Sequence, residues 1–249
     1  MNAFNVKNKI ALVTGANRGI GLAYVETLIK QGASKVYACA RDAAALDNLN
    51  ALNATHNTDC VEAVLLDVTR AEHIQALKEK ISELDLLINN AGIINGYFFC
   101  DENAVDTTKD EMQTNYYAPL NITRAFLTPL KQRKGAIINI SSIAGICSFP
   151  GLGSYSASKA ALHSQTQGIR MELSADGVLV AGVYPGPIDT RMAADFDIEK
   201  APPSEVAEYT LKAIARGETD IFPDAFSRQM YELFLNNPKE LEKTFAEMH

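Results

Sequence analysis

The sequence predicts an α/β fold in which helices cover both faces of a doubly wound parallel sheet of about seven strands. Short apolar runs rich in β-branched residues alternate along the chain with longer segments in which apolar residues recur every three or four positions. Each short run is nearly continuous in apolar residues, which is typical of strands covered on both faces. No linker, repeat or low-complexity segment interrupts the 249 residues, so we expect a single domain over residues 1–249.

The strands follow from the apolar runs, and the helices follow from the periodic segments between them. The expected strands are Ile10–Thr14, Lys35–Ala40, Val61–Leu66, Leu84–Asn89, Ala136–Ser141 and Val178–Tyr184, with a weaker seventh at Asp220–Phe222. The clearest expected helices are Leu22–Lys30, Ala71–Ile81 and Ser158–Leu173. Gly32 follows the first helix in the position of a C-terminal cap, and the Pro-rich stretch Ala201–Ser204 precedes another helix. The chain after Phe226 is expected to be helical with a break at Pro238.

Composition and charge narrow the function. The formal net charge is −7, which argues against a nucleic-acid or anionic-membrane partner. The N-terminus has no signal-like apolar leader and the apolar runs are too short to cross a bilayer, which favours a cytoplasmic protein. The cysteines and histidines lack metal-ligand spacing, so we expect no metal site and free, mostly buried thiols. These residues are Cys39, Cys60, Cys100 and Cys147, and His56, His73, His163 and His249.

A glycine-rich loop, residues 15–21 (GANRGIG), connects the first expected strand to the first helix. Gly15 permits a sharp turn off the strand, Gly19 permits close approach to a pyrophosphate, and Gly21 permits close helix–sheet packing. The helix N-terminus then offers free N–H groups to phosphates. The spacing is GxxxGxG and not the commoner GxGxxG, so a glycine-rich turn without a ligand stays an alternative.

Two arginines indicate which dinucleotide binds. The second strand ends at Ala40-Arg41, where an enzyme selective for a free ribose 2′-hydroxyl would carry a carboxylate. Arg41 and Arg18 are able to form charge-assisted hydrogen bonds with a 2′-phosphate, which favours NADP(H) and leaves NAD(H) possible. Solvated surface arginines are the alternative, and Asp42 is a competitor for Arg41.

The segment Tyr155-Ser156-Ala157-Ser158-Lys159 carries a candidate catalytic pair. Tyr155 and Lys159 are four residues apart and share one helical face, so the lysine charge, together with a positive nicotinamide ring, is expected to lower the pKa of the phenol. A half-buried tyrosine beside an exposed lysine is the alternative. Ser142 lies thirteen residues before Tyr155 at a strand end, where its hydroxyl is able to bond a substrate oxygen, and Ser141 is the competing assignment.

Taken together, these segments resemble the compact, single-domain branch of the short-chain dehydrogenase/reductase family, which has a Rossmann-type fold. The matching segments are TGANRGIG (14–21), LDVT (66–69), NNAG (89–92), NISS (139–142), YSASK (155–159) and PGPIDT (185–190). They run in family order, and the resemblance covers roughly residues 7–225.

The resemblance implies a role for each matching residue. Tyr155 would exchange the proton, Ser142 would polarise the substrate oxygen, and Lys159 would also hold the nicotinamide ribose. Asn115 would support a water relay to the lysine. The alternative role, an asparagine inside a helix that bonds to backbone, is compatible with this. Asp67 and Val68 would flank the adenine, and Thr190 would hold the carboxamide. The remaining cofactor contacts implied are Gly15, Asn17, Arg18, Gly19, Ile20, Gly21, Arg41, Asn89, Ala91, Gly92, Pro185, Gly186 and Ile188, together with Tyr155 and Lys159.

The expected function is therefore hydride transfer between NADP(H) and a carbonyl or alcohol carbon. Apolar candidates for the pocket wall favour an uncharged substrate, although the same residues would also suit a core. They are Ile94, Phe98, Ala144, Ile146, Phe149, Pro187 and Met192. The alternatives are a non-catalytic NADP(H)-binding regulator, and an isomerase or dehydratase that uses the same Tyr/Lys pair with a retained cofactor.

Two departures from the family pattern bear on the periphery. The segment 190–203 is short, so we expect a small substrate lid. The helical tail 226–249 replaces the glycine-rich final strand ending that many family tetramers share, so we expect a homodimer formed through the helices around Asn115 and Tyr155.

Overall fold

The computed structural model describes residues 3–96 and 98–248. It contains one seven-stranded sheet with the strand order β3-β2-β1-β4-β5-β6-β7, and all neighbouring strands are parallel. The strands are β1 Ile10–Val13, β2 Lys35–Ala40, β3 Val61–Leu65, β4 Leu86–Asn89, β5 Ala136–Ile140, β6 Leu179–Val183 and β7 Asp220–Ile221. Every predicted strand is confirmed, including the weak seventh, and most are one or two residues shorter than the apolar runs.

Helices cover both faces of the sheet. They are α1 Gly19–Lys30, α2 Leu46–Thr55, α3 Ala71–Lys80, α4 Ala104–Met112, α5 Ala118–Ala125, α6 Leu127–Gln132, α7 Gly153–Leu173, α8 Pro203–Ala215, α9 Ala225–Asn236 and α10 Pro238–Glu247. A π-helical turn, η2 Gln113–Tyr117, joins α4 to α5, and the short 3-10 helices are η1 Ala43–Ala45, η3 Ile143–Gly145 and η4 Arg191–Ala193. None of the helices among the described residues is both long and apolar enough to cross a membrane.

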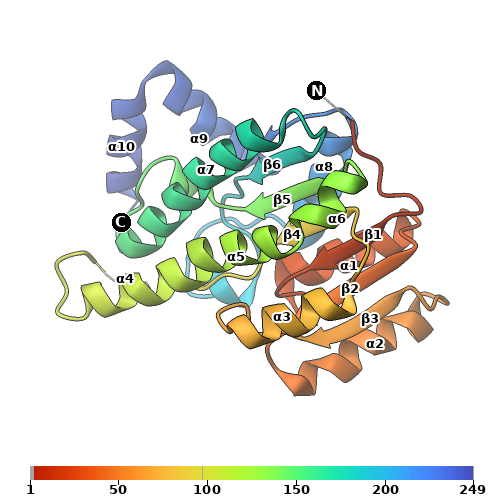
Figure 1. Cartoon of the computed structure of the whole chain (residues 1–249). Coiled ribbons are helices and arrows are strands. Elements are labelled where there is room, and N and C mark those ends of the chain that lie inside the picture. Colours follow the sequence, from red (N-terminus) through yellow and green to blue (C-terminus); the bar gives the residue numbers. More distant parts are fainter. Residues whose placement is uncertain (1–2, 97, 249) are drawn as a thin grey trace.

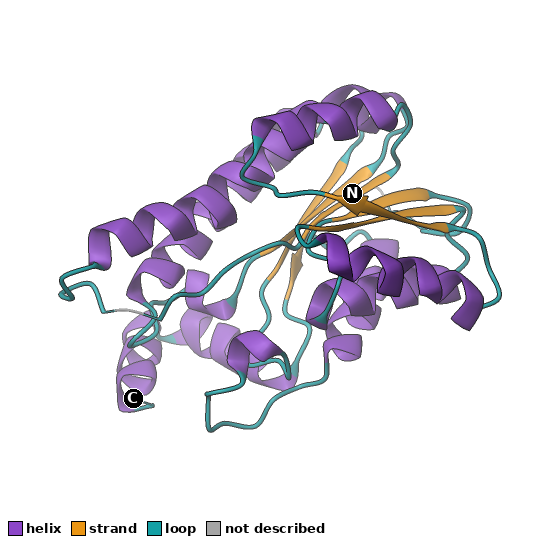
Figure 2. Ribbon diagram, turned by 90° about the horizontal axis from the view of Figure 1, so that it is seen from below, coloured by secondary structure: helices purple, strands orange, loops and turns teal. Residues whose placement is uncertain are grey.

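The core has two layers, one on each face of the sheet. Helices α1, α2 and α8 pack on one face through residues such as Leu28 and Leu211, and α3, α5, α6 and α7 pack on the other through residues such as Phe126 and Leu130. Figure 2 shows the strands as a central layer between these two groups of helices. The doubly wound parallel architecture predicted from the alternating runs is therefore confirmed.

The strand order reverses at β1, which is flanked by β2 on one side and by β4 on the other. In parallel sheets such a switch point opens a crevice at the carboxyl ends of the two diverging strands. The Thr14 hydroxyl joins these ends by accepting bonds from the backbone N–H groups of Asn90 and Ala91, each at 3.0 Å. The crevice is thus bounded by the two loops that carry the TGANRGIG and NNAG segments.

The helical tail forms α9 and α10 on either side of Asn237, with the predicted break before Pro238. Both helices lie beside α7 at one end of the molecule (Figure 1). Asp224 caps α9 through a hydrogen bond from the Ser227 backbone N–H at 2.8 Å, and this pair forms a capping box. Phe245 of α10 is fully buried and its ring lies 5.2 Å from that of Phe149, so the tail packs on the loop that precedes α7.

Helix α7 begins at Gly153, before the apolar period of Ser158–Leu173, so the segment with Tyr155 and Lys159 opens this helix as their shared helical face requires. One expectation needs correction. The thiols are free, but only Cys39 and Cys60 are buried, while Cys100 is exposed and Cys147 is half-buried, since both lie in loops. His249 lies outside the described residues, and no cluster of three potential metal ligands occurs within residues 3–96 and 98–248.

Candidate active site

Tyr155 and Lys159 meet on the buried face of α7, as their four-residue spacing predicts. Tyr155 is 9% exposed and Lys159 is 4% exposed, so the alternative of an exposed lysine is wrong. The Lys159 ammonium donates a hydrogen bond to the Ile140 carbonyl at 2.8 Å and lies 5.6 Å from the centroid of the Tyr155 ring. The helix therefore holds a buried cation over the face of the phenol.

The two serines after β5 separate in role. The Ser142 hydroxyl lies near the Tyr155 phenol and acts to lower its pKa. It donates to the Pro185 carbonyl at 3.4 Å and accepts the Ala144 backbone N–H at 3.1 Å. The Ser141 hydroxyl instead donates to the Lys159 carbonyl at 3.0 Å, so it anchors α7 to β5. Of the two, Ser142 is the one that faces the phenol, in agreement with its spacing to Tyr155.

The lowered phenol pKa predicted for lysine and the nicotinamide cation together is not produced by the chain alone. Burial raises the pKa of Tyr155 to about 12, and this effect outweighs the lowering by nearby Ser142. Burial also lowers the pKa of the Lys159 ammonium to about 8. The sequence placed the lysine charge correctly but gave no measure of desolvation, so the sign of the Tyr155 shift was missed.

Asn115 lies in η2 and is fully buried. Its side-chain oxygen accepts the Ile93 backbone N–H at 2.9 Å, and its amide donates to the Ile93 carbonyl and to the Ser158 hydroxyl, both at 2.9 Å. A Cβ atom at Gly92 would lie 3.1 Å from the Asn115 oxygen and 3.4 Å from the Lys159 nitrogen. Asn115 therefore holds the loop after β4 directly beside Lys159.

Glu111 is a buried charged residue that sequence reasoning missed. It lies one helical turn before Asn115 and its side chain is fully buried. One carboxylate oxygen accepts the Asn95 backbone N–H at 2.8 Å, and the other has no hydrogen-bond partner within the described residues. Its charge contributes to raising the pKa of both Tyr155 and Lys159. The sequence signal that could have identified Glu111 is its position four residues before Asn115, on the same face of a helix that packs against α7.

The glycine loop has the geometry that its residue types require. Gly15 and Gly19 have φ angles of +63° and +54°, and a Cβ atom at Gly21 would collide with the Gly15 carbonyl. The N-terminus of α1 carries no side-chain cap and no acidic residue in its first turn. Thr190 lies against Gly19, since a Cβ atom there would be 3.0 Å from the threonine methyl group. The loop and the start of the 190–203 segment therefore lie together at one helix N-terminus.

Both arginines predicted to choose the cofactor are exposed, and neither forms an ion pair with any described residue. The Asp42 carboxylate does not compete for Arg41 by a direct contact, because it accepts the Ala44 backbone N–H at 3.0 Å and caps η1. Two unpaired cations, Arg18 and Arg41, thus follow the glycine loop and the end of β2.

The adenine-side candidates lie after β3. Val68 is buried in the sheet core. Burial raises the pKa of Asp67, but hydrogen bonds from the Thr69 hydroxyl and backbone N–H, at 2.7 and 2.9 Å, help to hold it below its usual value overall. The Arg41 charge adds to this lowering. Asp67 is therefore ionised at neutral pH and lies within electrostatic reach of Arg41.

The two asparagines of the NNAG segment have different partners. The Asn89 side chain is 2% exposed and donates to the Asn139 oxygen at 2.8 Å inside the sheet, which leaves its backbone to line the cofactor as predicted. It points away from the crevice because alternate side chains of a strand face opposite sides, and Asn89 faces α5 and α7. Asn90, which was not predicted, instead donates to the carbonyls of Thr14 and Gly15 at 2.9 and 3.1 Å. Asn90 is thus the residue that holds the glycine loop.

The PGPIDT segment is anchored to the tail. The Gly186 backbone N–H donates to the Asp224 carboxylate at 2.9 Å, and a Cβ atom at Gly186 would lie 2.7 Å from the Phe226 ring. Ile188 is buried and forms a parallel bridge with Ala201, which closes the base of the loop 189–200. The start of α9 therefore positions the segment predicted to contact the nicotinamide, a link that no local pattern indicates.

Part of the expected pocket wall surrounds Tyr155. Ile94, Ala144 and Phe149 form an apolar cluster with it, joined by Leu152 and Phe196, which were not predicted. Phe196 brings the short loop 189–200 over this cluster. Of the other expected wall residues, Ile146 packs with Phe245 and other side chains of the helical tail, while Phe98 and Met192 are 45% and 43% exposed. Pro187 is half-buried.

Comparison with known proteins agrees with this geometry. A family model described as short chain dehydrogenase matches residues 9–201. The chain is 36% identical over 217 residues to an uncharacterized oxidoreductase of Staphylococcus saprophyticus, covering 84% of this chain and 92% of the relative. An uncharacterized oxidoreductase of Staphylococcus aureus strain MRSA252 is similar to the same extent, at 36% identity over 217 residues.

Solved structures extend the similarity to nearly the whole chain. A short chain dehydrogenase from Burkholderia cenocepacia in complex with NADP has a TM-score of 0.90 and 32% identity, covering 97% of this chain and 99% of that chain. A short-chain dehydrogenase from Sphingobium yanoikuyae in complex with NADPH has a TM-score of 0.80 and 27% identity, covering 94% and 95%. The chain belongs to the short-chain dehydrogenase family and is an oxidoreductase of that family. The resemblance inferred from the sequence segments is confirmed.

Proposed function

We propose that this chain is an NADP(H)-dependent oxidoreductase that transfers a hydride between nicotinamide and a carbonyl or alcohol carbon. The observation that carries the proposal is the buried cluster at the start of α7, in which Tyr155 lies beside Ser142 and under the Lys159 ammonium. Burial raises the pKa of Tyr155, so the phenol carries its proton at neutral pH. It is the group placed to exchange that proton with a substrate oxygen.

The crevice at the carboxyl end of β1 fits a dinucleotide. Gly15 and Gly19 adopt positive φ angles, and the uncapped N-terminus of α1 leaves backbone N–H groups for a pyrophosphate. Gly92 has no side chain where Asn115 and Lys159 converge, which leaves space beside the catalytic lysine. Arg18 and Arg41 form no ion pair within the described residues, although the Asp67 charge acts on Arg41. Both exposed guanidinium groups suit a ribose 2′-phosphate and support NADP(H) over NAD(H).

The residues of the chain then act on the substrate oxygen. Bound reduced nicotinamide supplies the hydride to the carbonyl carbon. Tyr155 donates its proton to the carbonyl oxygen, so that C=O becomes CH–OH, while the Ser142 hydroxyl stabilises the charge that develops there. Lys159, whose pKa of about 8 leaves it mostly protonated at pH 7, stabilises the phenolate that remains. Asn115 positions the loop beside Lys159 and, as the family resemblance implies, supports a water relay to it.

The apolar cluster around Tyr155 indicates the substrate class. Ile94, Ala144, Phe149, Leu152 and Phe196 offer no charged group to a ligand in contact with the phenol. An uncharged carbonyl or alcohol therefore fits better than a small acid. The segment 190–203 is proposed as the substrate lid, since its residue Phe196 contacts this cluster.

The test follows consumption of NADPH, and separately of NADH, across a panel of aldehydes, ketones and quinones. We expect a preference for NADPH and a loss of turnover in Tyr155→Phe between about a hundredfold and ten-thousandfold, with NADPH binding retained. Tyr117→Phe, at an exposed tyrosine, is the matched control and should keep full activity. Equal turnover in Tyr155→Phe would contradict the proposal. NADPH binding without turnover on the whole panel would favour the regulator, and tightly retained cofactor with no net consumption would favour an isomerase or dehydratase.

A homodimer through the helices around Asn115 and Tyr155 is part of the proposal. Large apolar side chains are exposed on these helices, namely Val105 on α4 and Met171 on α7, at 67% and 72%. A second copy of the chain would bury them. Sedimentation equilibrium should report twice the chain mass of 27.1 kDa, and a monomer at micromolar concentration would argue against it.

A further inference from the structure

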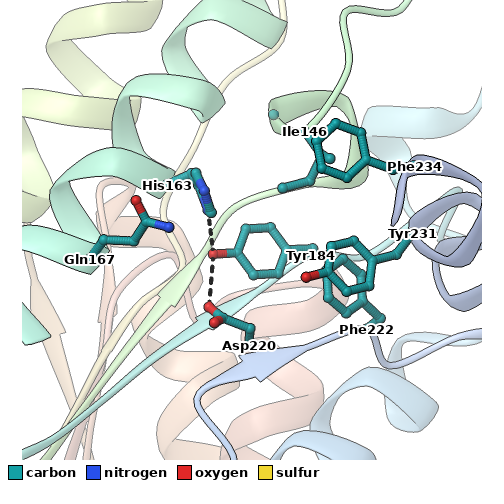
Figure 3. A pocket seen from close by; sticks show the side chains of 9 residues that line it. Ile146, His163, Gln167, Tyr184, Asp220, Phe222, Tyr231 and Phe234 are labelled. Atoms are coloured by element: carbon teal, nitrogen blue, oxygen red, sulfur yellow. Dashed lines mark hydrogen bonds between the residues drawn. The ribbon is translucent and has the colours of Figure 1, made fainter. Parts of the chain in front are cut away.

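A second cavity, of about 240 Å³, lies between α7, the ends of β6 and β7, and α9. Figure 3 shows a hydrogen-bonded group of His163, Tyr184 and Asp220 on one side of it and the rings of Phe222, Tyr231 and Phe234 on the other. Neither Tyr155 nor Ser142 lines it. The proposed reaction uses none of these polar residues, so the cavity needs its own explanation.

The hydrogen bonds of the polar side fix the protons. Asp220 accepts two bonds from the Arg170 guanidinium, at 2.8 and 3.1 Å, so its oxygens act as acceptors. The Tyr184 hydroxyl lies 3.3 Å from Asp220 and must donate to it. Having used its only proton, that hydroxyl accepts from His163 Nδ1 at 2.7 Å. His163 is thereby held with its proton on Nδ1 and an acceptor lone pair on Nε2.

The Nε2 atom is the unused group of this chain of bonds. It makes no hydrogen bond to any residue in the described part of the chain. Burial lowers the pKa of His163 below its usual value, so the ring is neutral at pH 7. Gln167, one turn further along α7, lines the same side. The cavity therefore presents a fixed acceptor on a neutral imidazole.

The position of Tyr184 depends on the absence of a side chain below it. A Cβ atom at Gly182 would collide with the Tyr184 hydroxyl, so the ring lies back across the sheet over this glycine. With any larger residue at position 182, the hydroxyl would not reach both His163 and Asp220. The polar side of the cavity is thus built by residues from α7, β6 and β7 together.

The opposite side is a stack of aromatic rings. Phe222 lies between Tyr184, at 5.0 Å and 20°, and Tyr231, at 3.8 Å and 15°. Phe234 continues the stack at 6.3 Å and 16° from Tyr231. Such parallel ring faces favour a planar aromatic partner.

We propose that this cavity binds a small, uncharged aromatic molecule whose single hydroxyl or ring N–H donates to His163 Nε2. An uncharged ligand fits because the Asp220 charge is paired with Arg170 and His163 is neutral. The volume corresponds to about eight waters at ~30 Å³ each, which suits a one-ring compound. The ring of the ligand packs against Tyr231 and Phe234.

The site adjoins the proposed active site without overlapping it. His163 lies one turn after Lys159 on α7. Gly145, which also lines the cavity, is in tight contact with the Lys159 backbone, since a Cβ atom there would lie 2.8 Å from it. A ligand here would therefore contact the elements that carry Lys159 while leaving the phenol of Tyr155 free.

The test uses the whole chain with NADPH present and phenol as the probe, followed by long-range ¹H–¹⁵N NMR of the histidine rings. We expect the free protein to show His163 as the neutral Nδ1–H tautomer, and phenol to shift its Nε2 resonance saturably. His163→Leu should weaken phenol binding about five- to tenfold, as expected for one lost hydrogen bond. Toluene, which lacks the donor, should bind wild type as weakly as phenol binds His163→Leu.

Three further variants separate the site from its alternatives. Tyr184→Phe keeps the ring but frees the imidazole, so it should mix the His163 tautomers and weaken phenol severalfold while leaving toluene unchanged. Tyr155→Phe and the exposed control Tyr117→Phe should bind phenol as wild type does. The proposal is overturned if phenol does not shift His163, if the ring carries its proton on Nε2, or if Tyr155→Phe abolishes binding, which would place phenol in the proposed active site.

Discussion

The two ends of the sheet both bury charge, but they satisfy it differently. At the amino end, the Asp85 carboxylate is completely buried and accepts hydrogen bonds from the Ile10 backbone N–H, the Lys9 ammonium and the Arg133 guanidinium. At the carboxyl end, Lys159 donates one hydrogen bond, to Ile140, and one oxygen of Glu111 has no partner within the described residues.

The buried charge of Asp85 stabilises the fold, whereas the buried charge of Lys159 remains available for chemistry. Burial raises the pKa of Asp85, but the bonds from Arg133, Ile10 and Lys9 outweigh it, so the pKa lies below its usual value. For Lys159 burial prevails, and its pKa falls to about 8. A charge with complete partners favours the folded state, whereas a desolvated charge with few partners costs stability and stays available for chemistry.

The largest expected effect is the loss of turnover when the buried charge at the carboxyl end of the sheet is removed. Lys159→Met removes the cation that stabilises the Tyr155 phenolate, and turnover should fall by about a thousandfold, or ~4 kcal/mol. Single-turnover rates measured with saturating NADPH check this. A loss of less than tenfold would remove Lys159 from the proposed chemistry.

The same variant tests the cost of the buried charge through pH. The folded pKa of Lys159 is about 8 and its ordinary value is 10.5, so between these values the unfolded chain binds more protons. Stability of the wild type must then rise with pH across this window, by up to about 3 kcal/mol relative to Lys159→Met. Urea denaturation at intervals from pH 7 to pH 10.5 measures the difference, and parallel curves for the two proteins would contradict it.

Asp85→Asn removes the buried charge at the amino end of the sheet and should reduce stability without reducing turnover. It leaves Lys9 and Arg133 without their shared carboxylate and should lower the free energy of unfolding by about 3 kcal/mol at pH 7. Turnover per folded molecule should be unchanged, since Asp85 lies at the other end of the sheet. Because the folded pKa of Asp85 is depressed, its contribution is present above the ordinary value of 3.8 and is lost as pH falls below it. A deficit that persisted in strong acid would point to packing and not to charge.

Arg41→Ala tests an exposed charge at the rim of the crevice, in contrast to the two buried charges. We expect NADPH binding to weaken by about 2 kcal/mol, or roughly thirtyfold, while NADH binding is unchanged. Arg70→Ala, at an exposed arginine paired with Glu72, is the control and should alter neither. Fluorescence titration of both cofactors measures the effect, and equal losses for NADPH and NADH would refute the 2′-phosphate assignment.

The smallest expected effect concerns Glu111. Glu111→Gln keeps an oxygen for the Asn95 N–H but removes the charge that helps to raise the pKa of Tyr155 and Lys159. Both pKa values should fall, and the alkaline limb of the rate profile should move to lower pH by up to about one unit. A lower rate with an unmoved profile would assign Glu111 a purely structural role.

The fold was largely predictable because its signals are local. Strand periodicity, the glycine loop and the i,i+4 pair of Tyr155 and Lys159 each depend on residues close in sequence. Gly15, Gly19 and Gly21 are required by backbone geometry, so they indicate a turn before any tertiary contact is known.

The misses have a common cause. The Asn89 side chain faces the core and Asn90 serves the glycine loop, because strand registers and side-chain directions decide which polar group reaches the crevice. In the sequence, Glu111 looks like any charged residue on the exposed side of a helix. Only the packing of α4 against α7 makes it a buried neighbour of Lys159.

The sequence by itself determined the succession of strands and helices along the chain, the dinucleotide loop and the residues of the candidate catalytic group. These features depend on short-range patterns. Tertiary structure alone decided the sign of the Tyr155 pKa shift, the anchoring of Gly186 by Asp224 and the meeting of His163, Tyr184 and Asp220. Desolvation and hydrogen bonds between distant elements arise only when the sheet and its helices have packed, because both depend on what surrounds a side chain and not on its neighbours in sequence.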